Sequence, residues 1–162
     1  MASLTRGVRV VVASFSRSRF FRRFGPWIMP RAERGWARLN RGKTPLSGLL
    51  VPSLVLHTVG AKSGLDRDSA LMYCPEPGGA MLVTGSNFAR DEHPAWTANL
   101  AAHPDAAVTL KGRRMRVRAT RIADDELDET WNYIERQWPG YRGYERASGR
   151  ILRIFRLVPV AE

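Results

Sequence analysis

Five short apolar segments, each bounded by turn-forming residues, occupy most of the chain between residues 49 and 122 and restrict the folds open to it. Their length, their β-branched content and the Gly, Pro and Asp residues between them predict β-strands. The strands are expected at residues 49–59, 69–74, 80–85, 106–111 and 114–122. Only one short helix is predicted among them, at residues 94–102, starting near a proline. This order lacks the strand–helix alternation of a doubly wound nucleotide-binding fold.

The C-terminal third adds one helix and one strand to this pattern. Apolar side chains at positions 127, 131, 134 and 138 share the spacing of a single helix face, and Pro139-Gly140 ends the helix. Residues 138–144 form an aromatic loop broken by glycine, and residues 151–158 predict a sixth strand. We therefore expect an α+β fold: a small barrel of about six mostly antiparallel strands with helices packed outside.

Positive charge is concentrated at the N-terminal end. The 162-residue chain has a formal net charge of +11, and residues 1–50 hold 11 Lys and Arg against one acidic residue. The remaining 15 basic and 14 acidic residues nearly balance. The sequence thus divides into a basic arm and connector, residues 1–48, and a nearly neutral domain, residues 49–162. A basic arm on a neutral domain is typical of proteins that meet an anionic partner.

The arm has the composition of an amphipathic helix on an anionic bilayer. Within residues 1–24, valine and phenylalanine at helical spacing alternate with arginine. We expect a cytoplasmic protein held peripherally at the inner face of the plasma membrane. A solvated or core-packed helix and a cleaved transit sequence are the alternatives. No nucleic-acid-binding motif accompanies the charge, so a nucleic-acid partner is not expected, and the oligomeric state is left open.

The sequence offers little catalytic machinery of its own. Its single cysteine, Cys74, and its three scattered histidines predict neither a disulfide framework nor a metal site. No motif pairs a nucleophile with a base. If the protein is an enzyme, a bound cofactor is expected to carry the chemistry.

The turn at residues 60–67 is the strongest candidate for a binding site. Gly60 and Gly64 allow backbone amides to point into one concavity, while Lys62, Ser63 and Arg67 supply two cations and a hydroxyl. Such a cradle suits phosphate. The alternative is an ordinary glycine-containing turn with solvated charges.

Three further segments offer polar or aromatic groups. Residues 84–87 follow a predicted strand and carry hydroxyl and amide groups suited to the edge of a heterocycle. Trp96 is either a core residue or a ligand wall. The aromatic loop at residues 138–144 either walls a site for a flat ligand or packs on the barrel. By contrast, the arginines at 114, 116 and 118 alternate with apolar residues and predict a solvated sheet face.

Taken in order, these segments resemble the deazaflavin-dependent nitroreductase family. The resemblance is carried by Gly60-x-Lys62-Ser63-Gly64-x-x-Arg67, by the strand leading into Ser86, by Pro94-x-Trp96-x-x-Asn99-Leu100 with His103-Pro104, and by Trp138-Pro139-Gly140-Tyr141-Arg142-x-Tyr144. Members are split β-barrel oxidoreductases that use coenzyme F420. The resemblance implies hydride transfer from reduced F420 to a quinone, nitroaromatic or similar conjugated acceptor. Alternatives are a non-catalytic F420-binding or membrane-surface module, and an FMN-dependent enzyme on the same barrel.

The resemblance also implies roles for individual residues. Coenzyme-binding residues would be Ala61, Lys62, Ser63, Arg67, Asp68, Ser69, Ala70, Leu71, Thr84, Gly85, Ser86, Asn87, Ala95, Trp96, Thr97, Ala98 and Asn99. The first four would hold the phosphate and the acidic tail. Trp138, Tyr141 and Tyr144 would bind the acceptor, and Ser86, Tyr141 and Tyr144 would be catalytic.

Overall fold

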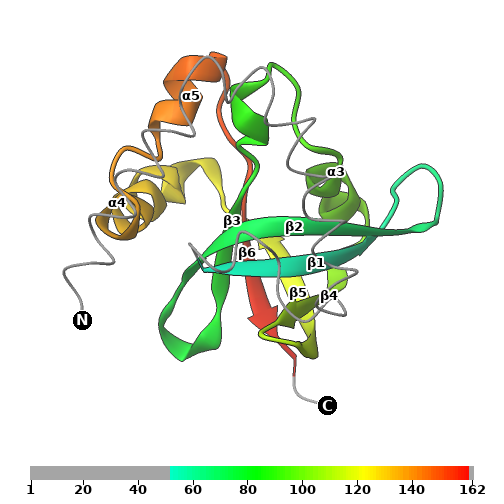
Figure 1. Cartoon of the computed structure of the whole chain (residues 1–162). Helices are drawn as coiled ribbons and strands as arrows, with labels where there is room; N and C mark the ends of the chain where they lie inside the picture. The colour runs from blue at the N-terminus through cyan, green and yellow to red at the C-terminus, as the bar shows by residue number, and fades with distance from the viewer. Residues whose placement is uncertain (1–51, 161–162) are drawn as a thin grey trace.

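The predicted strands all form, and together they close into one barrel (Figure 1). The computed structural model describes residues 52–160. The strands of this part are β1 (Ser53–Val59), β2 (Asp66–Pro75), β3 (Met81–Thr84), β4 (Asp105–Leu110), β5 (Arg113–Arg121) and β6 (Ile154–Pro159). They follow one another in the order β1-β2-β3-β6-β5-β4, β4 pairs again with β1, and every pairing is antiparallel. The expected α+β split-barrel class is confirmed.

Side chains alternate between the barrel interior and the outside, as the period of two along a strand requires. The interior is filled by aliphatic and aromatic side chains, among them Leu54, Leu56, Val83, Val108, Val117, Phe155 and Leu157. On β5 the buried Val117 and Ala119 alternate with exposed arginines. The prediction that Arg114, Arg116 and Arg118 form a solvated face is confirmed.

Helices cover two sides of the barrel. In the described part of the chain these are α3 (Ala95–Ala102), α4 (Leu127–Gln137) and α5 (Gly143–Ser148). Figure 1 shows α4 and α5 together on one side, and α3 on the other beside β1. The predicted apolar stripe of α4 is buried: Trp131, Ile134 and Trp138 pack with Leu82, Ile122 and Ile154 in a second core.

The structure corrects three details. Residues 143–148 form helix α5, where the sequence predicted a loop through residue 144 and no helix after it, so the described part has three α-helices rather than two. The segment is only six residues long and has no apolar stripe, so its helix depends on tertiary contacts described below. Strand β6 begins at Ile154 rather than at residue 151, and β2 begins at Asp66 rather than at residue 69.

The predicted arm and connector, residues 1–48, lie outside the described residues. Within residues 52–160, no helix is long and apolar enough to cross a bilayer.

Candidate functional site

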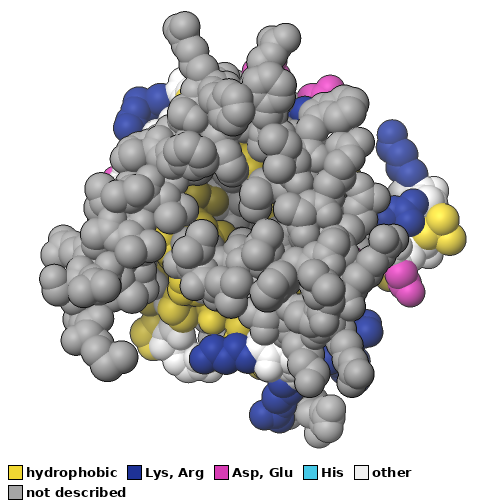
Figure 2. Space-filling model, in the orientation of Figure 1, with side chains coloured by type: hydrophobic (Ala, Val, Ile, Leu, Met, Phe, Trp, Pro, Cys, Tyr) yellow, Lys and Arg dark blue, Asp and Glu magenta, His cyan; other side chains and the backbone are white. Residues whose placement is uncertain are grey.

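The turn between β1 and β2 is closed by its own backbone. The Gly60 amide donates to the Leu65 carbonyl at 2.8 Å, and the Gly64 amide donates to the Gly60 carbonyl at 2.8 Å. Gly64 has a φ of 66°, a left-handed conformation that glycine adopts without steric cost. The side chains from Ala61 to Asp68 are all exposed, and Figure 2 shows Lys and Arg side chains projecting where this turn lies at the right of the view.

The two cations of the turn are available to a ligand. Neither Lys62 nor Arg67 forms an ion pair with another residue between positions 52 and 160, and Arg67 donates only to the backbone carbonyl of Asp66, at 3.1 Å. Ser63 Oγ accepts from the Leu65 amide at 3.3 Å. Two unneutralised cations on a rigid turn can bind a phosphate or a carboxylate.

A buried asparagine of α3 holds this turn in place. Asn99, 6% exposed, accepts a hydrogen bond from the Ala61 amide at 3.0 Å. Its amide nitrogen donates to Thr58 Oγ1 at 3.0 Å, and Thr58 Oγ1 in turn donates to the Arg67 carbonyl at 3.4 Å. One side chain therefore fixes both ends of the cationic turn to the helix.

We expect Asn99→Leu to lower the free energy of unfolding and to loosen the β1–β2 turn. The substitution leaves the Ala61 amide and the Thr58 hydroxyl without their partner, which costs about 1–3 kcal/mol for a buried polar group. Asn132→Leu, the same change at an exposed residue of α4, is the matched control and should alter stability by no more than about 0.5 kcal/mol. Urea unfolding of the two variants checks this, and equal losses would contradict the assigned contacts.

The loop after β3 has an unusual backbone. Asn87, Phe88 and Ala89 have φ values of 46°, 56° and 57°, three successive non-glycine residues in the left-handed region. Gly85 lies against the start of α3: a Cβ there would sit 2.9 Å from Thr97 Cγ2 and 3.2 Å from the Arg153 carbonyl. The Gly85 amide donates to that same carbonyl at 2.8 Å. The loop is thus pressed against α3 and the start of β6, with no room for a side chain at residue 85.

The aromatic residues of the 138–144 segment meet this loop. Tyr141 Oη donates to Ser86 Oγ over a long 3.4 Å contact. The Tyr141 ring packs against Tyr144 at 5.2 Å and against Trp131 at 6.2 Å between ring centroids. Burial, and secondarily the neighbouring Tyr144, raise the pKa of the Tyr141 phenol well above its ordinary value. The phenol is therefore a hydrogen-bond donor across the physiological pH range.

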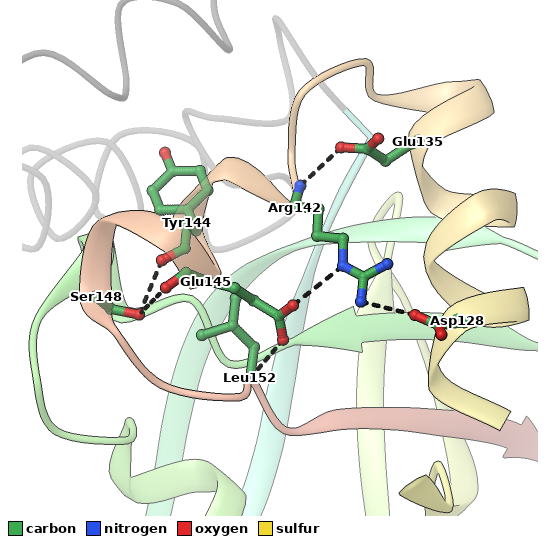
Figure 3. Close-up of polar contacts among 7 residues, drawn as sticks. All are labelled: Asp128, Glu135, Arg142, Tyr144, Glu145, Ser148 and Leu152. Carbon is green, nitrogen blue, oxygen red and sulfur yellow. Dashed lines mark hydrogen bonds and ion pairs between the residues drawn. The ribbon is translucent and has the colours of Figure 1, made fainter. Parts of the chain in front are cut away.

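A network around Arg142, which lies between Tyr141 and Tyr144 in sequence, ties this segment to α4 and α5 (Figure 3). The Arg142 guanidinium donates to Asp128 of α4 at 2.7 Å and to Glu145 of α5 at 3.2 Å, and its backbone amide donates to Glu135 at 3.0 Å. Glu145 also accepts from the Leu152 amide at 2.9 Å. The hydrogen bond to Asp128 contributes most to raising the pKa of Arg142. These contacts explain why the short α5 forms although its sequence lacks an apolar stripe.

The structure gathers the expected site residues into two regions joined by α3. The first is the β1–β2 turn with the adjoining strand, residues 61–63 and 67–71; the second is the loop at residues 84–87. Of the expected site residues on α3, only Ala95 and Ala98 are exposed. Trp96 lies in the barrel core, edge-on to Phe155, and Thr97 is fully buried. Trp138 and Tyr144 are buried as well, which leaves Tyr141 as the partly exposed member of the aromatic segment.

Several polar residues of this region were not singled out from the sequence. His57 lies on β1 with its ring nitrogens 2.6 Å from the Asp68 carboxylate and 2.8 Å from Thr109 Oγ1. Arg142 appeared in a motif without a role, and Arg150 and His93 appeared in none. Arg150 and His93 bind partners 57 to 65 positions away, and Arg142 reaches Asp128 14 positions away, so no local spacing could have indicated these contacts.

Folding stability should fall as His93 becomes protonated. Its Nδ1 accepts from Arg150 Nη1 at 2.9 Å, which requires that nitrogen to be unprotonated. Burial, followed by the charges of Arg153, Arg150 and Arg121, lowers the pKa of His93 below its ordinary 6.5; Asp91 also faces Arg150. Because the folded-state pKa is depressed, the contribution is complete above about pH 6.5 and is lost as pH falls through the lowered value.

His93→Asn is the variant that tests this, because the Asn oxygen can accept from Arg150 and does not titrate. The stability difference between wild type and variant, measured by urea unfolding from pH 8 to pH 5, should move in favour of the variant below pH 6.5. Parallel profiles would contradict the prediction.

Comparison with known proteins agrees with this geometry. The model of the F420H(2)-dependent quinone reductase family matches residues 31–159. The chain belongs to this family. An F420H(2)-dependent quinone reductase of Mycobacterium tuberculosis (strain ATCC 25618 / H37Rv) is 31% identical over 102 residues, covering 61% of this chain and 68% of the relative. A putative member from Mycobacterium bovis matches equally well.

Solved structures show the same barrel. An F420-H2 dependent reductase superposes with a TM-score of 0.57 at 26% identity, covering 65% of this chain and 93% of the other. A chain solved as a domain-swapped dimer gives a TM-score of 0.59 at 23% identity, covering 76% of this chain and 95% of the other. Family membership confirms the expected enzyme class, an F420H2-dependent oxidoreductase, and F420 as the coenzyme rather than FMN.

The residues present fit this coenzyme. F420 carries a flat deazaflavin, a phosphate and an acidic tail. The β1–β2 turn offers two cations without carboxylate partners among residues 52–160, which can bind the phosphate and the acidic tail. A protonated phenol faces Ser86 from the other side of that loop.

Proposed function

We propose that the reductase transfers a hydride to a quinone, nitroaromatic or similar conjugated acceptor at a site built from the β1–β2 turn, the 84–87 loop and Tyr141. The observation that carries this proposal is the double anchoring of α3. Asn99 binds the cationic turn, and two residues earlier Thr97 contacts Gly85 of the loop. Side chains two positions apart point to different sides of a helix, so α3 lies between the anion-binding turn and the ring-binding loop and contacts both.

The turn would hold the phosphate and tail of F420. Lys62 and Arg67 supply the charges, and Ser63 supplies a hydroxyl. The Ala61 amide is occupied by Asn99, so Ala61 contributes by shaping the turn. Asp68, Ser69, Ala70 and Leu71 continue along β2 beside it, with Asp68 already bonded to His57.

The loop would hold the deazaflavin. Thr84, Gly85, Ser86 and Asn87 would line one edge of the ring, and the exposed Ala95 and Ala98 of α3, with their small side chains, would leave room for it. The buried Trp96, Thr97 and Asn99 would not touch the ring. They would support the site by packing in the core and by hydrogen bonding to the β1–β2 turn. When bound, reduced F420 supplies a hydride from C5 of its deazaflavin ring.

Tyr141 would orient the acceptor. With the acceptor bound, the phenol proton would turn from Ser86 Oγ to a carbonyl or nitro oxygen and so polarise it, and the Ser86 hydroxyl would then donate to Tyr141 Oη. Tyr144 and Trp138 support the Tyr141 ring from the buried side. Holding both reactants in fixed geometry is the contribution of the protein to the rate.

Fluorescence titration of F420, followed by steady-state oxidation of F420H2 with menadione and with a nitroaromatic, tests the proposal. We expect saturable binding and turnover of at least one acceptor, with Tyr141→Phe lowering kcat more than it changes coenzyme affinity. Folded protein that binds no F420 at tens of micromolar would refute the site. Binding without turnover of any acceptor would leave only a coenzyme carrier.

For residues 1–24 we propose peripheral attachment to an anionic membrane surface at the inner face of the plasma membrane. Support comes from the arginines interleaved with valine and phenylalanine, each worth about 1 kcal/mol near such a surface. Co-sedimentation with phosphatidylglycerol vesicles should require these residues and should weaken in high salt. Equal sedimentation with and without them would contradict attachment.

A further inference from the structure

One arginine donates to both ends of the left-handed loop. Arg150, in the segment between α5 and β6, donates through Nη1 to the Gly85 carbonyl at 3.1 Å and through Nη2 to the Ser86 carbonyl at 3.0 Å. Its Nε donates to the Arg90 carbonyl at 2.9 Å, and Nη1 also reaches His93 Nδ1 at 2.9 Å. The guanidinium therefore brackets residues 87–89, with two contacts before them and one directly after.

These contacts are not those of an ordinary surface ion pair. Among residues 52–160, no carboxylate forms an ion pair with Arg150. Its donors go to backbone carbonyls and a histidine although the side chain is partly buried, and desolvation lowers its pKa. A planar guanidinium can donate to several carbonyls at once and fix their positions, which the compact ammonium of a lysine cannot do.

The loop needs such support. Three successive non-glycine residues with positive φ are each disfavoured by roughly 1–2 kcal/mol. The loop's own backbone supplies only short-range bonds, from Ala89 to Ser86 at 2.9 Å and from Arg90 to Asn87 at 3.1 Å, while Asn87 Nδ2 donates to the Glu92 carbonyl at 2.8 Å. Arg150 is 60 or more residues away from the carbonyls it binds, so it ties this local turn to the rest of the fold.

We propose that Arg150 is a positioning residue: it fixes the strained 85–90 loop so that Ser86 faces Tyr141 and the deazaflavin edge. The inference rests on the proposed function for the placing of the coenzyme at this loop. Arg150 touches neither reactant; it acts through the backbone of Gly85, Ser86 and Arg90.

The first test needs no coenzyme. Hydrogen exchange of the full chain is followed at the amides of residues 85–92 in wild type, Arg150→Lys and Arg146→Lys. Arg146 is an exposed arginine on α5 and is the matched control. We expect exchange in this segment to accelerate at least tenfold in Arg150→Lys, with the barrel strands unchanged, and to stay at the wild-type rate in Arg146→Lys. An unchanged rate in Arg150→Lys overturns the proposal.

The second test separates geometry from charge. If Arg150 acts by holding the loop in place, Arg150→Lys and Arg150→Gln should both raise the Kd for F420 by about tenfold and lower kcat with menadione. The lysine variant fails like the glutamine variant because an ammonium cannot donate to these three carbonyls at once. A near-normal Arg150→Lys beside an impaired Arg150→Gln would mean that only the charge matters, and the proposal would be wrong. Wild-type protein that binds no F420 while exchange still depends on Arg150 would instead refute the proposed function alone.

Should Arg150→Lys fail to fold, His93→Leu replaces it. This variant removes one acceptor and leaves the guanidinium in place. A smaller acceleration of exchange, confined to residues 85–92, is expected, and its absence overturns the proposal.

Discussion

Replacing Lys62 and Arg67 together with alanine is expected to weaken F420 binding by about a hundredfold or more. Each charge-assisted hydrogen bond to an anion contributes roughly 1.5–3 kcal/mol, and tenfold in affinity corresponds to about 1.4 kcal/mol. Both side chains are exposed and have no ion-pair partner between residues 52 and 160, so folding stability should change by no more than about 0.5 kcal/mol. Fluorescence titration of the folded variant measures the loss.

The matched control for this variant is Arg114→Ala with Arg116→Ala. These two arginines are also exposed, lie on the outer face of β5 and remove the same net charge. Their replacement should change affinity by less than threefold at physiological salt, where charges beyond about 8 Å are largely screened. Equal losses in the two double variants would show that F420 responds to overall charge and not to the turn.

Trp131→Ala is expected to cost about 3–5 kcal/mol of unfolding free energy, the largest stability effect that a single residue of α4 can produce. Trp131 is 1% exposed and packs with Ile134, Trp138 and Tyr144, so its removal leaves a cavity between α4 and the barrel. The same cavity lies beside Tyr141, whose ring centroid is 6.2 Å from that of the indole. Urea unfolding should show the loss, together with lower activity from a displaced Tyr141.

Trp131→Phe separates packing from hydrogen bonding. The buried indole nitrogen of Trp131 has no hydrogen-bond partner among the described residues, so phenylalanine removes an unsatisfied donor while keeping one ring. We expect a loss of about 1–2 kcal/mol, less than half that of the alanine variant. Losses of equal size would mean that the indole nitrogen contributes a bond in solution.

The strand positions and the α4 stripe were predictable because each depends on a local period. Val117 and Ala119 alternate with arginines on β5, and Trp131, Ile134 and Trp138 repeat at helical spacing, so burial follows directly from the order of residues. The 60–67 turn was predictable for a similar reason, since its glycines and cations lie within eight positions. Helix α5 was missed because its stability comes from Glu135, Asp128 and Leu152, none of which lies within it.

By itself the sequence determined which segments are strands, where the charge lies, and which short motifs tie the chain to its family. Only the tertiary structure decided that Asn99 anchors the cationic turn, that Trp96 belongs to the core, and that Arg150 spans both ends of the loop carrying Ser86. The physical reason is the range of the interactions. Hydrophobic periodicity and turn chemistry act between neighbours in sequence, whereas the hydrogen bonds of Asn99 and Arg150 join residues 38 to 65 positions apart and exist only once the barrel has closed.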